Sequence, residues 1–246
     1  MHPTTPLVMI HGLLGSISYF SPAARLPELA VYTPDLLGYG RHSGCSEVLT
    51  LQRQAHHVAS YIRTQVGRPC HLLGHSVGGA VAMLLAWLEP GLVQSVISVE
   101  GNLTLNDAFW CRRIAPLEES EWAAEYREMQ AHPENWLIDA EIDPNPQRIG
   151  WARRILDNQP ASTVQAMARA VVSETVDLLD PVKALVDRGL PIRLLAGEKS
   201  AVGWDVPPWL REAASADMVL PGVGHMMMLE QPDRFCATVE AMLGDR

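Results

Sequence analysis

The feature that most constrains the fold of this 246-residue chain is an alternation of short apolar runs with longer helical segments. Six runs are almost continuously apolar, as strands covered on both faces must be. They predict strands at 7–10, 30–33, 71–73, 95–99, 192–196 and 218–220. Helical periodicity lies between or after several of these runs, at 51–66, 78–88 and 233–243. Because strand and helix alternate, the sequence predicts an α/β fold: a mostly parallel sheet of about six strands with helices on both faces.

One interval interrupts this alternation. Residues 102–189 contain no convincing strand, but they hold four of the seven tryptophans and show helical spacing at 121–130 and 163–172. Structureless loops of such length are rare in compact domains, so the interval is interpreted as an inserted helical cap. The predicted core domain is then formed by 1–101 and 190–246. The cap carries fifteen acidic and nine basic residues, a net charge of −6.

The overall composition argues against several classes of protein. The chain is 48% hydrophobic and 19% charged, which is ordinary for a globular protein and unlike a disordered one. Its net charge is −9, and no Lys/Arg cluster is longer than a pair. A nucleic-acid or anionic membrane surface would need a basic patch, so we expect neither partner.

Targeting and redox signals indicate a cytoplasmic protein. The longest run without charged or turn residues spans nine residues, 80–88, whereas a membrane span needs about 20. The N-terminal segment has no basic region and an apolar stretch of only four residues, unlike a secretory signal. The four cysteines have no Cys-x-x-Cys spacing, and we expect free thiols in a reducing compartment.

The sharpest local signal is the segment Gly74-His75-Ser76-Val77-Gly78, a G-x-S-x-G motif directly after a predicted strand and directly before a predicted helix. Such a strand-to-helix turn exposes the serine at its apex. The two glycines are needed because a side chain there would meet neighbouring backbone. The N-terminus of the following helix supplies free N–H groups and the positive end of its dipole. Ser76 is therefore the candidate nucleophile.

Three other segments complete a pattern that is similar to a known family. They are VMIHGL at 8–13, DLLGYGRHS at 35–43 and PGVGH at 221–225. With the serine motif, they make nearly the whole chain outside 102–189 resemble the α/β-hydrolase fold superfamily. The resemblance implies a serine-nucleophile esterase or thioesterase with an inserted helical cap.

The resemblance assigns roles to three further residues. His225 is the expected general base, since imidazole titrates near neutral pH and can take the proton of the Ser76 hydroxyl. The backbone N–H of Val77, directly after the nucleophile, is one expected donor of an oxyanion hole. The N–H of Leu13, after the His-Gly pair, is the other by resemblance.

The acid that should orient His225 is where the chain departs from the family. The resemblance places an aspartate where this chain has Ser200, which carries no charge. Glu100, at the end of the fourth predicted strand, is the first candidate, because haloalkane dehalogenases place their acid at that strand end. Asp205 is the second candidate and Glu198 the third. A Ser–His dyad without an acid remains open.

We expect no metal and no cofactor. The adjacent His56 and His57 would point to different faces of a helix, and the chain contains no H-E-x-x-H motif. The segment 38–40 reads Gly-Tyr-Gly and lacks the last glycine of a dinucleotide-binding fingerprint.

The predicted reaction is cleavage of a small, partly apolar carboxylic ester or thioester through an acyl-enzyme. The aromatic side chains of the cap, Phe109 among them, and the methionines at 226–228 could contact an acyl chain, although each of them more often serves packing. The negative cap disfavours polyanionic substrates. A C–C bond hydrolase, a lactonase or an acyltransferase of the same fold stays open as an alternative. So does a slow-turnover ligand-binding signalling protein, which the irregular acid favours. The sequence is compatible with a monomer or a homodimer.

Overall fold

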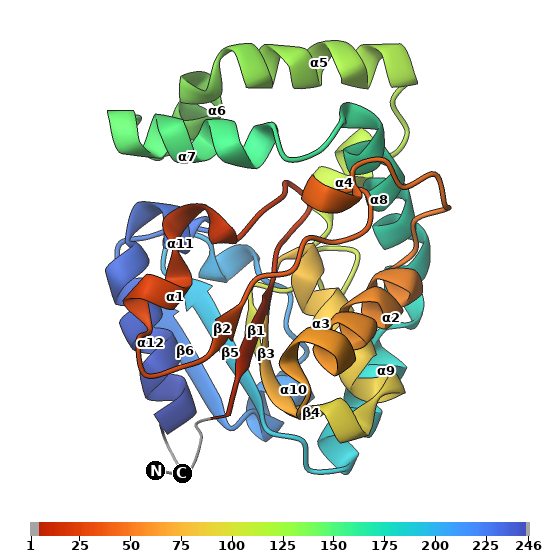
Figure 1. Cartoon of the computed structure of the whole chain (residues 1–246), viewed down its shortest axis with the longest axis vertical. Helices are drawn as coiled ribbons and strands as arrows, with labels where there is room; N and C mark the ends of the chain where they lie inside the picture. The colour runs from red at the N-terminus through yellow and green to blue at the C-terminus, as the bar shows by residue number, and fades with distance from the viewer. Residues whose placement is uncertain (1–4, 245–246) are drawn as a thin grey trace.

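A six-stranded, fully parallel sheet forms the centre of the computed structural model, which describes residues 5–244 (Figure 1). Residues 1–4 and 245–246 lie outside the described residues. They include the start of the N-terminal segment compared above with a secretory signal and the two outer ends of the predicted core domain. The strands are β1 (Leu7–Ile10), β2 (Val31–Tyr32), β3 (Cys70–His75), β4 (Val93–Val99), β5 (Ile192–Gly197) and β6 (Ala216–Leu220). All six predicted strands are present, and the predicted fold class is confirmed.

The order of the strands is β2-β1-β3-β4-β5-β6. The chain therefore leaves β1 in one direction to reach β2 and crosses back to place β3 on the other side of β1. In open α/β sheets, ligands bind at the carboxyl ends of the strands beside such a reversal. All four residues of β1 are buried, as its position inside the sheet requires.

Helices cover both faces of the sheet. On one face lie α2 (Leu51–Tyr61), α3 (Val77–Leu88) and α9 (Leu179–Asp187), while α1 (Pro22–Arg25) and α12 (Pro232–Gly244) pack together on the other (Figure 1). The predicted helix at 51–66 has a last turn of wider, π-helical geometry, closed by the N–H of Gly67 on the carbonyl of Ile62. The remaining short core helices are α10 (Pro208–Ala213) and α11 (Met227–Glu230).

Five of the helices between β4 and β5 are named the cap helices. They are α4 (Phe109–Ile114), α5 (Glu119–Ala131), α6 (Pro133–Asp139), α7 (Pro146–Leu156) and α8 (Ala161–Glu174). In Figure 1, α5, α6 and α7 lie across the top of the molecule, beyond the carboxyl ends of the strands. In contrast, α9 packs against α3 in the core layer although it falls inside the predicted insertion. The division of the chain at 101/102 and 189/190 stays a prediction.

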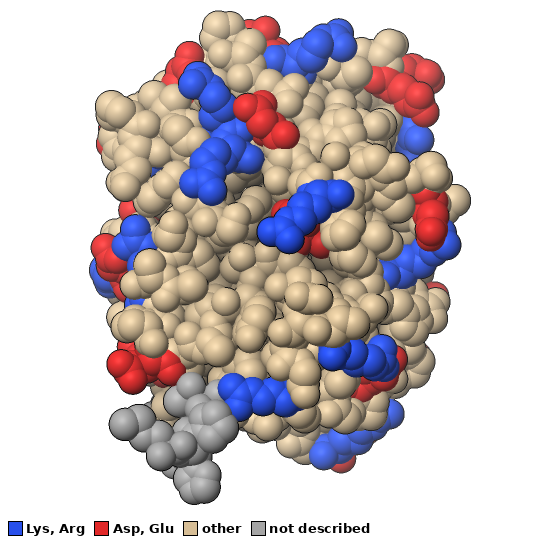
Figure 2. Space-filling model, in the orientation of Figure 1, with Lys and Arg blue, Asp and Glu red and all other residues tan. Residues whose placement is uncertain are grey.

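Within residues 5–244, no helix has both the length and the apolar character needed to cross a membrane. Figure 2 shows acidic and basic side chains interspersed over the face that it displays.

Candidate active site

Ser76 lies at the turn between β3 and α3, with φ 54° and ψ −123°. A non-glycine residue with positive φ is uncommon and strained, and Glu100 at the end of β4 is another, with φ 41°. The turn is tight because glycines permit it: a Cβ on Gly74 would collide with the carbonyl of Gly78, and a Cβ on Gly78 would collide with the carbonyls of Ile10 and His11 at the end of β1. The local backbone thus holds the serine at the carboxyl edge of the sheet.

The hydroxyl of Ser76 donates a hydrogen bond to Oδ1 of Asn102 at 3.4 Å. The backbone N–H of Asn102 in turn donates to the carbonyl of Ser76 at 3.0 Å. Asn102 is 3% exposed, so its carboxamide is a buried, fixed neighbour of the serine. Nothing in the sequence assigned this residue a role. The only signal in the sequence was its position two residues after Glu100, the charged residue at the end of a predicted strand.

His225 and Glu100 are brought together by the fold across 125 positions of sequence. Nδ1 of His225 lies 2.7 Å from Oε2 of Glu100. The other carboxylate oxygen, Oε1, accepts hydrogen bonds from the N–H of Gly197 at 2.7 Å and the hydroxyl of Ser200 at 2.6 Å. The serine that stands where the family resemblance places an acid therefore contacts Glu100 and helps to fix it.

Glu100 is suited to remain ionised. Its burial would raise the pKa of the carboxyl, but hydrogen bonds from His225, Ser200 and Gly197, together with the charge of His225, hold that pKa below its ordinary value. A buried carboxylate on Nδ1 favours the tautomer in which Nδ1 carries the proton and Nε2 is free to accept one.

A second histidine, His75, lies against His225. Their ring centroids are 4.6 Å apart, and Nε2 of His75 is 3.0 Å from the carbonyl oxygen of His225. Burial, and then the charge of His225, lower the pKa of His75 to about 3. His75 is therefore neutral near pH 7 and donates its Nε2–H to that carbonyl, which anchors the backbone of His225.

The loop after β1 passes directly beside Ser76, since a Cβ on Gly12 would lie 3.0 Å from the Cβ of Ser76. Nε2 of the buried His11 accepts the N–H of Leu36 at 3.1 Å, so its Nδ1 carries the proton and donates to the carbonyl of Gly12 at 2.9 Å. That carbonyl belongs to the same peptide as the N–H of Leu13. His11 therefore fixes the plane of this peptide and, with it, the direction of the Leu13 N–H.

Val77 begins α3, so its N–H is one of those that an α-helix leaves without an internal partner. Val77 and Leu13, the two predicted oxyanion donors, thus belong to the segments on either side of Ser76. The hydroxyl of Tyr39 donates to the carbonyl of Leu13 at 2.9 Å and holds the loop from its far side.

The other two acid candidates lie elsewhere. Oδ2 of Asp205 accepts hydrogen bonds from the hydroxyl of Thr104 and the amide of Asn106, both at 2.8 Å. Oε2 of Glu198 accepts the N–H of Gly222 at 2.8 Å. The structure joins only Glu100, among the three candidates, to His225 by a hydrogen bond. Within the described residues, no group of three or more His, Cys, Asp or Glu side chains is arranged to hold a metal ion.

The aromatic residues of the insertion divide into two groups. Trp122 and Trp136 are buried, and the indole of Trp122 donates to the carbonyl of Ala161, so these side chains pack the cap itself. Phe109 is 64% exposed, and Trp110 is partly buried beneath the guanidinium of Arg113. The methionines after His225 also differ, because 227 and 228 are buried and 226 is partly exposed.

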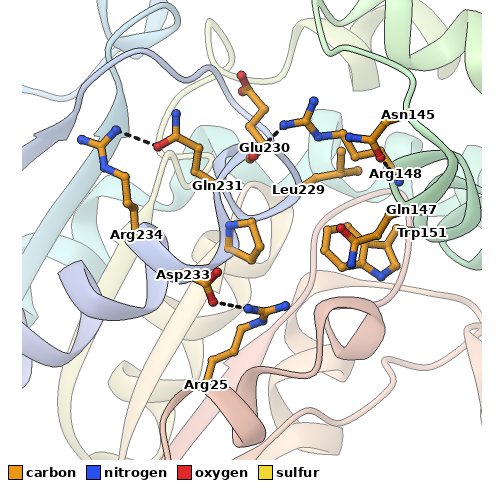
Figure 3. Close-up of a pocket in the computed structure, with 11 residues that line it drawn as sticks. Arg25, Asn145, Gln147, Arg148, Trp151, Leu229, Glu230, Gln231, Asp233 and Arg234 are labelled. Carbon is orange, nitrogen blue, oxygen red and sulfur yellow. Dashed lines mark hydrogen bonds and ion pairs between the residues drawn. The ribbon is translucent and has the colours of Figure 1, made fainter.

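A cavity of about 410 Å³ lies at the seam between α7 and the core (Figure 3). It is lined by residues of α1, α7, α11 and α12, among them Arg25, Arg148, Trp151 and Arg234. Neither Ser76 nor His225 lines it. The link to the candidate site is indirect: Arg148 donates to the carbonyl of Glu230 at 2.8 Å, and the carboxylate of Glu230 accepts the N–H preceding His225, that of Gly224, at 2.6 Å.

Comparison with known proteins agrees with this architecture. The family model described as "Alpha/beta hydrolase family" matches residues 7–238, and the chain therefore belongs to the alpha/beta hydrolase family. It is 36% identical over 101 residues to the sn-1-specific diacylglycerol lipase ABHD11 of Xenopus tropicalis, a match that covers 40% of this chain and 32% of that lipase. It is 26% identical to Lipase LipV of Mycobacterium tuberculosis over 91% of this chain and 87% of that protein.

Solved structures show the same fold. A thermophilic esterase from Thermogutta terrifontis superposes with a TM-score of 0.73 at 22% identity, covering 97% of this chain and 89% of that one. At this identity the likeness establishes the fold alone.

Proposed function

We propose that this protein is a serine hydrolase that cleaves small, partly apolar carboxylic esters or thioesters through an acyl-enzyme on Ser76. The observation that carries the proposal is the pair formed by the buried Glu100 and Nδ1 of the partly exposed His225 at 2.7 Å, at the same edge of the sheet as the turn that holds Ser76. The sequence similarity to two lipases supports ester cleavage as the reaction class.

The proposed chemistry follows from the arrangement of these groups. The Ser76 hydroxyl turns from Asn102 towards Nε2 of His225, which takes its proton while Oγ attacks the carbonyl carbon of the ester. Glu100 keeps the imidazole in the required tautomer and stabilises the imidazolium. The N–H groups of Val77 and Leu13 donate to the oxygen that becomes negative. His225 then protonates the leaving alcohol, and water releases the acid.

The charge of the insertion and the exposure of its aromatic residues favour a neutral, partly apolar substrate. The insertion at 102–189 has a net charge of −6, which disfavours polyanionic esters by its field. Phe109 and Trp110 offer apolar surface on the cap side for an acyl chain of modest size. A neutral ester with a short or medium acyl group fits both properties. The hydrogen bonds of Glu100 to His225 and Ser200 favour an enzyme over a slow ligand-binding protein, because a carboxylate reaches His225 from the irregular position.

Steady-state hydrolysis of p-nitrophenyl esters from acetate to laurate tests the proposal. Wild type is compared with Ser76→Ala, Glu100→Gln and the control Asp205→Asn, whose parent side chain is bound to Thr104 and Asn106. We expect multiple turnovers by wild type and the control, none above background by Ser76→Ala, and strong loss in Glu100→Gln. If wild type turns over no faster than Ser76→Ala on every ester, the proposal is wrong.

A further inference from the structure

We propose that the side-chain oxygen of Asn102 binds the water molecule that hydrolyses the acyl-enzyme. The inference rests on the proposed function, because it assigns a second step to the same acyl-enzyme on Ser76. Asn102 is then a catalytic residue of deacylation, because it contacts the reacting water. His225, Glu100 and the two oxyanion donors act in both acylation and deacylation.

The position of Asn102 is fixed from several directions. Its own N–H is bound to the carbonyl of Ser76 at 3.0 Å, and the carbonyl of the preceding Gly101 accepts the indole N–H of Trp204 at 2.9 Å. Gly101 also packs so closely on Gly79 that a Cβ on either would meet the backbone of the other. With this backbone immobile and its side chain buried, Asn102 presents Oδ1 to the nucleophile at 3.4 Å.

Acylation changes what this oxygen can bind. In the resting enzyme, Oδ1 accepts the proton of the Ser76 hydroxyl. In the acyl-enzyme, Oγ is an ester oxygen that carries no proton, so the buried Oδ1 loses its donor. A buried amide oxygen requires another donor in place of the lost one. Water satisfies this requirement, and it is also the co-substrate that the next step consumes.

The resulting step is balanced in atoms and protons. One O–H of the water donates to Oδ1 of Asn102 and the other points to Nε2 of His225. The water oxygen forms a bond to the acyl carbonyl carbon while Nε2 takes the second proton. The tetrahedral intermediate then collapses by breaking the bond between carbon and Oγ, and Oγ recovers the proton from His225. The products are the carboxylic acid and Ser76 with its hydroxyl again bound to Asn102.

The test separates acylation from deacylation in Asn102→Ala with p-nitrophenyl butyrate. We expect kcat and KM to fall together by about 10²-fold, the typical effect of losing one positioned hydrogen-bonding group, while kcat/KM, which reports acylation, changes less than threefold. Intact-protein mass spectrometry should then detect the butyryl adduct in the steady state. The matched control is Asn106→Ala, an asparagine of the same loop whose amide is bound to Asp205, and it should leave all three kinetic parameters unchanged.

A second variant, Asn102→Asp, keeps the size and an acceptor oxygen of the side chain. It is expected to deacylate faster than Asn102→Ala in single-turnover experiments, and circular dichroism melting verifies that each variant is folded. The inference is overturned if kcat/KM falls in proportion to kcat, if Asn102→Ala behaves as Asn106→Ala does, or if Asn102→Asp deacylates no faster than Asn102→Ala. The proposed function fails separately, when wild-type turnover does not depend on Ser76.

Discussion

The core and the cap helices of this molecule are held in place by different kinds of contact. Around Ser76 the geometry is set by backbone: glycines that cannot carry a Cβ, two residues with positive φ, and peptides fixed by buried histidines. The cap helices are joined mainly by side chains, such as the ion pair between Arg113 and Glu125 at 2.8 Å, about half exposed. The groups of the candidate active site thus lie where the chain has least conformational freedom, and the cap helices lie where it has more.

The largest expected effect contrasts two glycines. In the core, Gly74→Ala places a Cβ against the carbonyl of Gly78 with no room to move, and we expect a loss of about 4 kcal/mol or more in the free energy of unfolding, or no folded protein. In cap helix α7, Gly150 has open space around its Cβ position. There Gly150→Ala should stabilise the protein by about 0.5–1 kcal/mol, because alanine favours the helix. Urea unfolding of both variants measures the difference. Equal effects would contradict the contrast between core and cap.

The next effect concerns catalysis in the core. In Glu100→Gln, the Gly197 N–H and the Ser200 hydroxyl continue to bind the amide oxygen, so the new NH2 group faces Nδ1 of His225. Nδ1 must then accept, the proton moves to Nε2, and Nε2 can no longer take the proton of Ser76. We expect kcat to fall by about 10³–10⁴-fold, as the wrong tautomer does in serine proteases, with little change in stability. The control Glu198→Gln should retain full ester hydrolysis, and equal activity of the two variants would contradict the role of Glu100.

The comparison also explains what the sequence could and could not predict. The four inner strands are mostly buried and leave continuous apolar runs, and the two edge strands, β2 and β6, keep short apolar runs although they are more exposed. The turn around Ser76 has obligatory glycines that make a readable motif. Glu100 could be ranked first but not chosen, since nothing local in a sequence reports that Ser200 will bind a carboxylate from the neighbouring strand. Asn102 was missed because a loop asparagine has no pattern of its own.

The cap was harder to predict for a related reason. The helical spacing at 121–130 and 163–172 corresponds to α5 and α8, but α6 has only seven residues, and α6 and α7 both begin with prolines and pack against one another. Their extent depends on tertiary contacts rather than on periodicity. Likewise, α9 belongs to the core because it packs against α3. No glycine or proline in the sequence lies between it and α8, the cap helix before it.

A smaller effect comes from the pH dependence of stability. His75 titrates at about 3 in the folded protein and near 6.5 when unfolded, so between these values the unfolded chain binds more protons. The free energy of unfolding should therefore fall as the pH drops from about 6.5 towards 3, by at most about 1.4 kcal/mol per pH unit from this residue. His75→Gln removes this dependence, whereas the buried His11, whose pKa burial also lowers, acts alike in both proteins. Urea unfolding at pH 7.5, 6 and 5 measures this effect. As the pH drops, the free energy of unfolding of wild type should fall relative to that of His75→Gln, and parallel curves would contradict the assignment.

The smallest effect concerns the seam between cap and core (Figure 3). Arg148 extends from α7 to the carbonyl of Glu230, whose carboxylate holds the N–H of Gly224 beside His225. Removing this partly buried, charge-assisted hydrogen bond in Arg148→Gln should lower the free energy of unfolding by about 1 kcal/mol. Because it also loosens α7, KM for p-nitrophenyl esters should rise several-fold while kcat changes less. The control Glu125→Gln weakens the exposed ion pair with Arg113 within the cap but leaves Arg113 over Trp110, so it should cost about 0.5 kcal/mol or less, with KM unchanged. If both variants alter KM equally, the seam is not the contact that positions the cap. If Arg148→Gln lowers kcat alone, Arg148 acts through the loop of His225 instead, and the separation between a backbone-built site and a side-chain-held cap is then incomplete at this point.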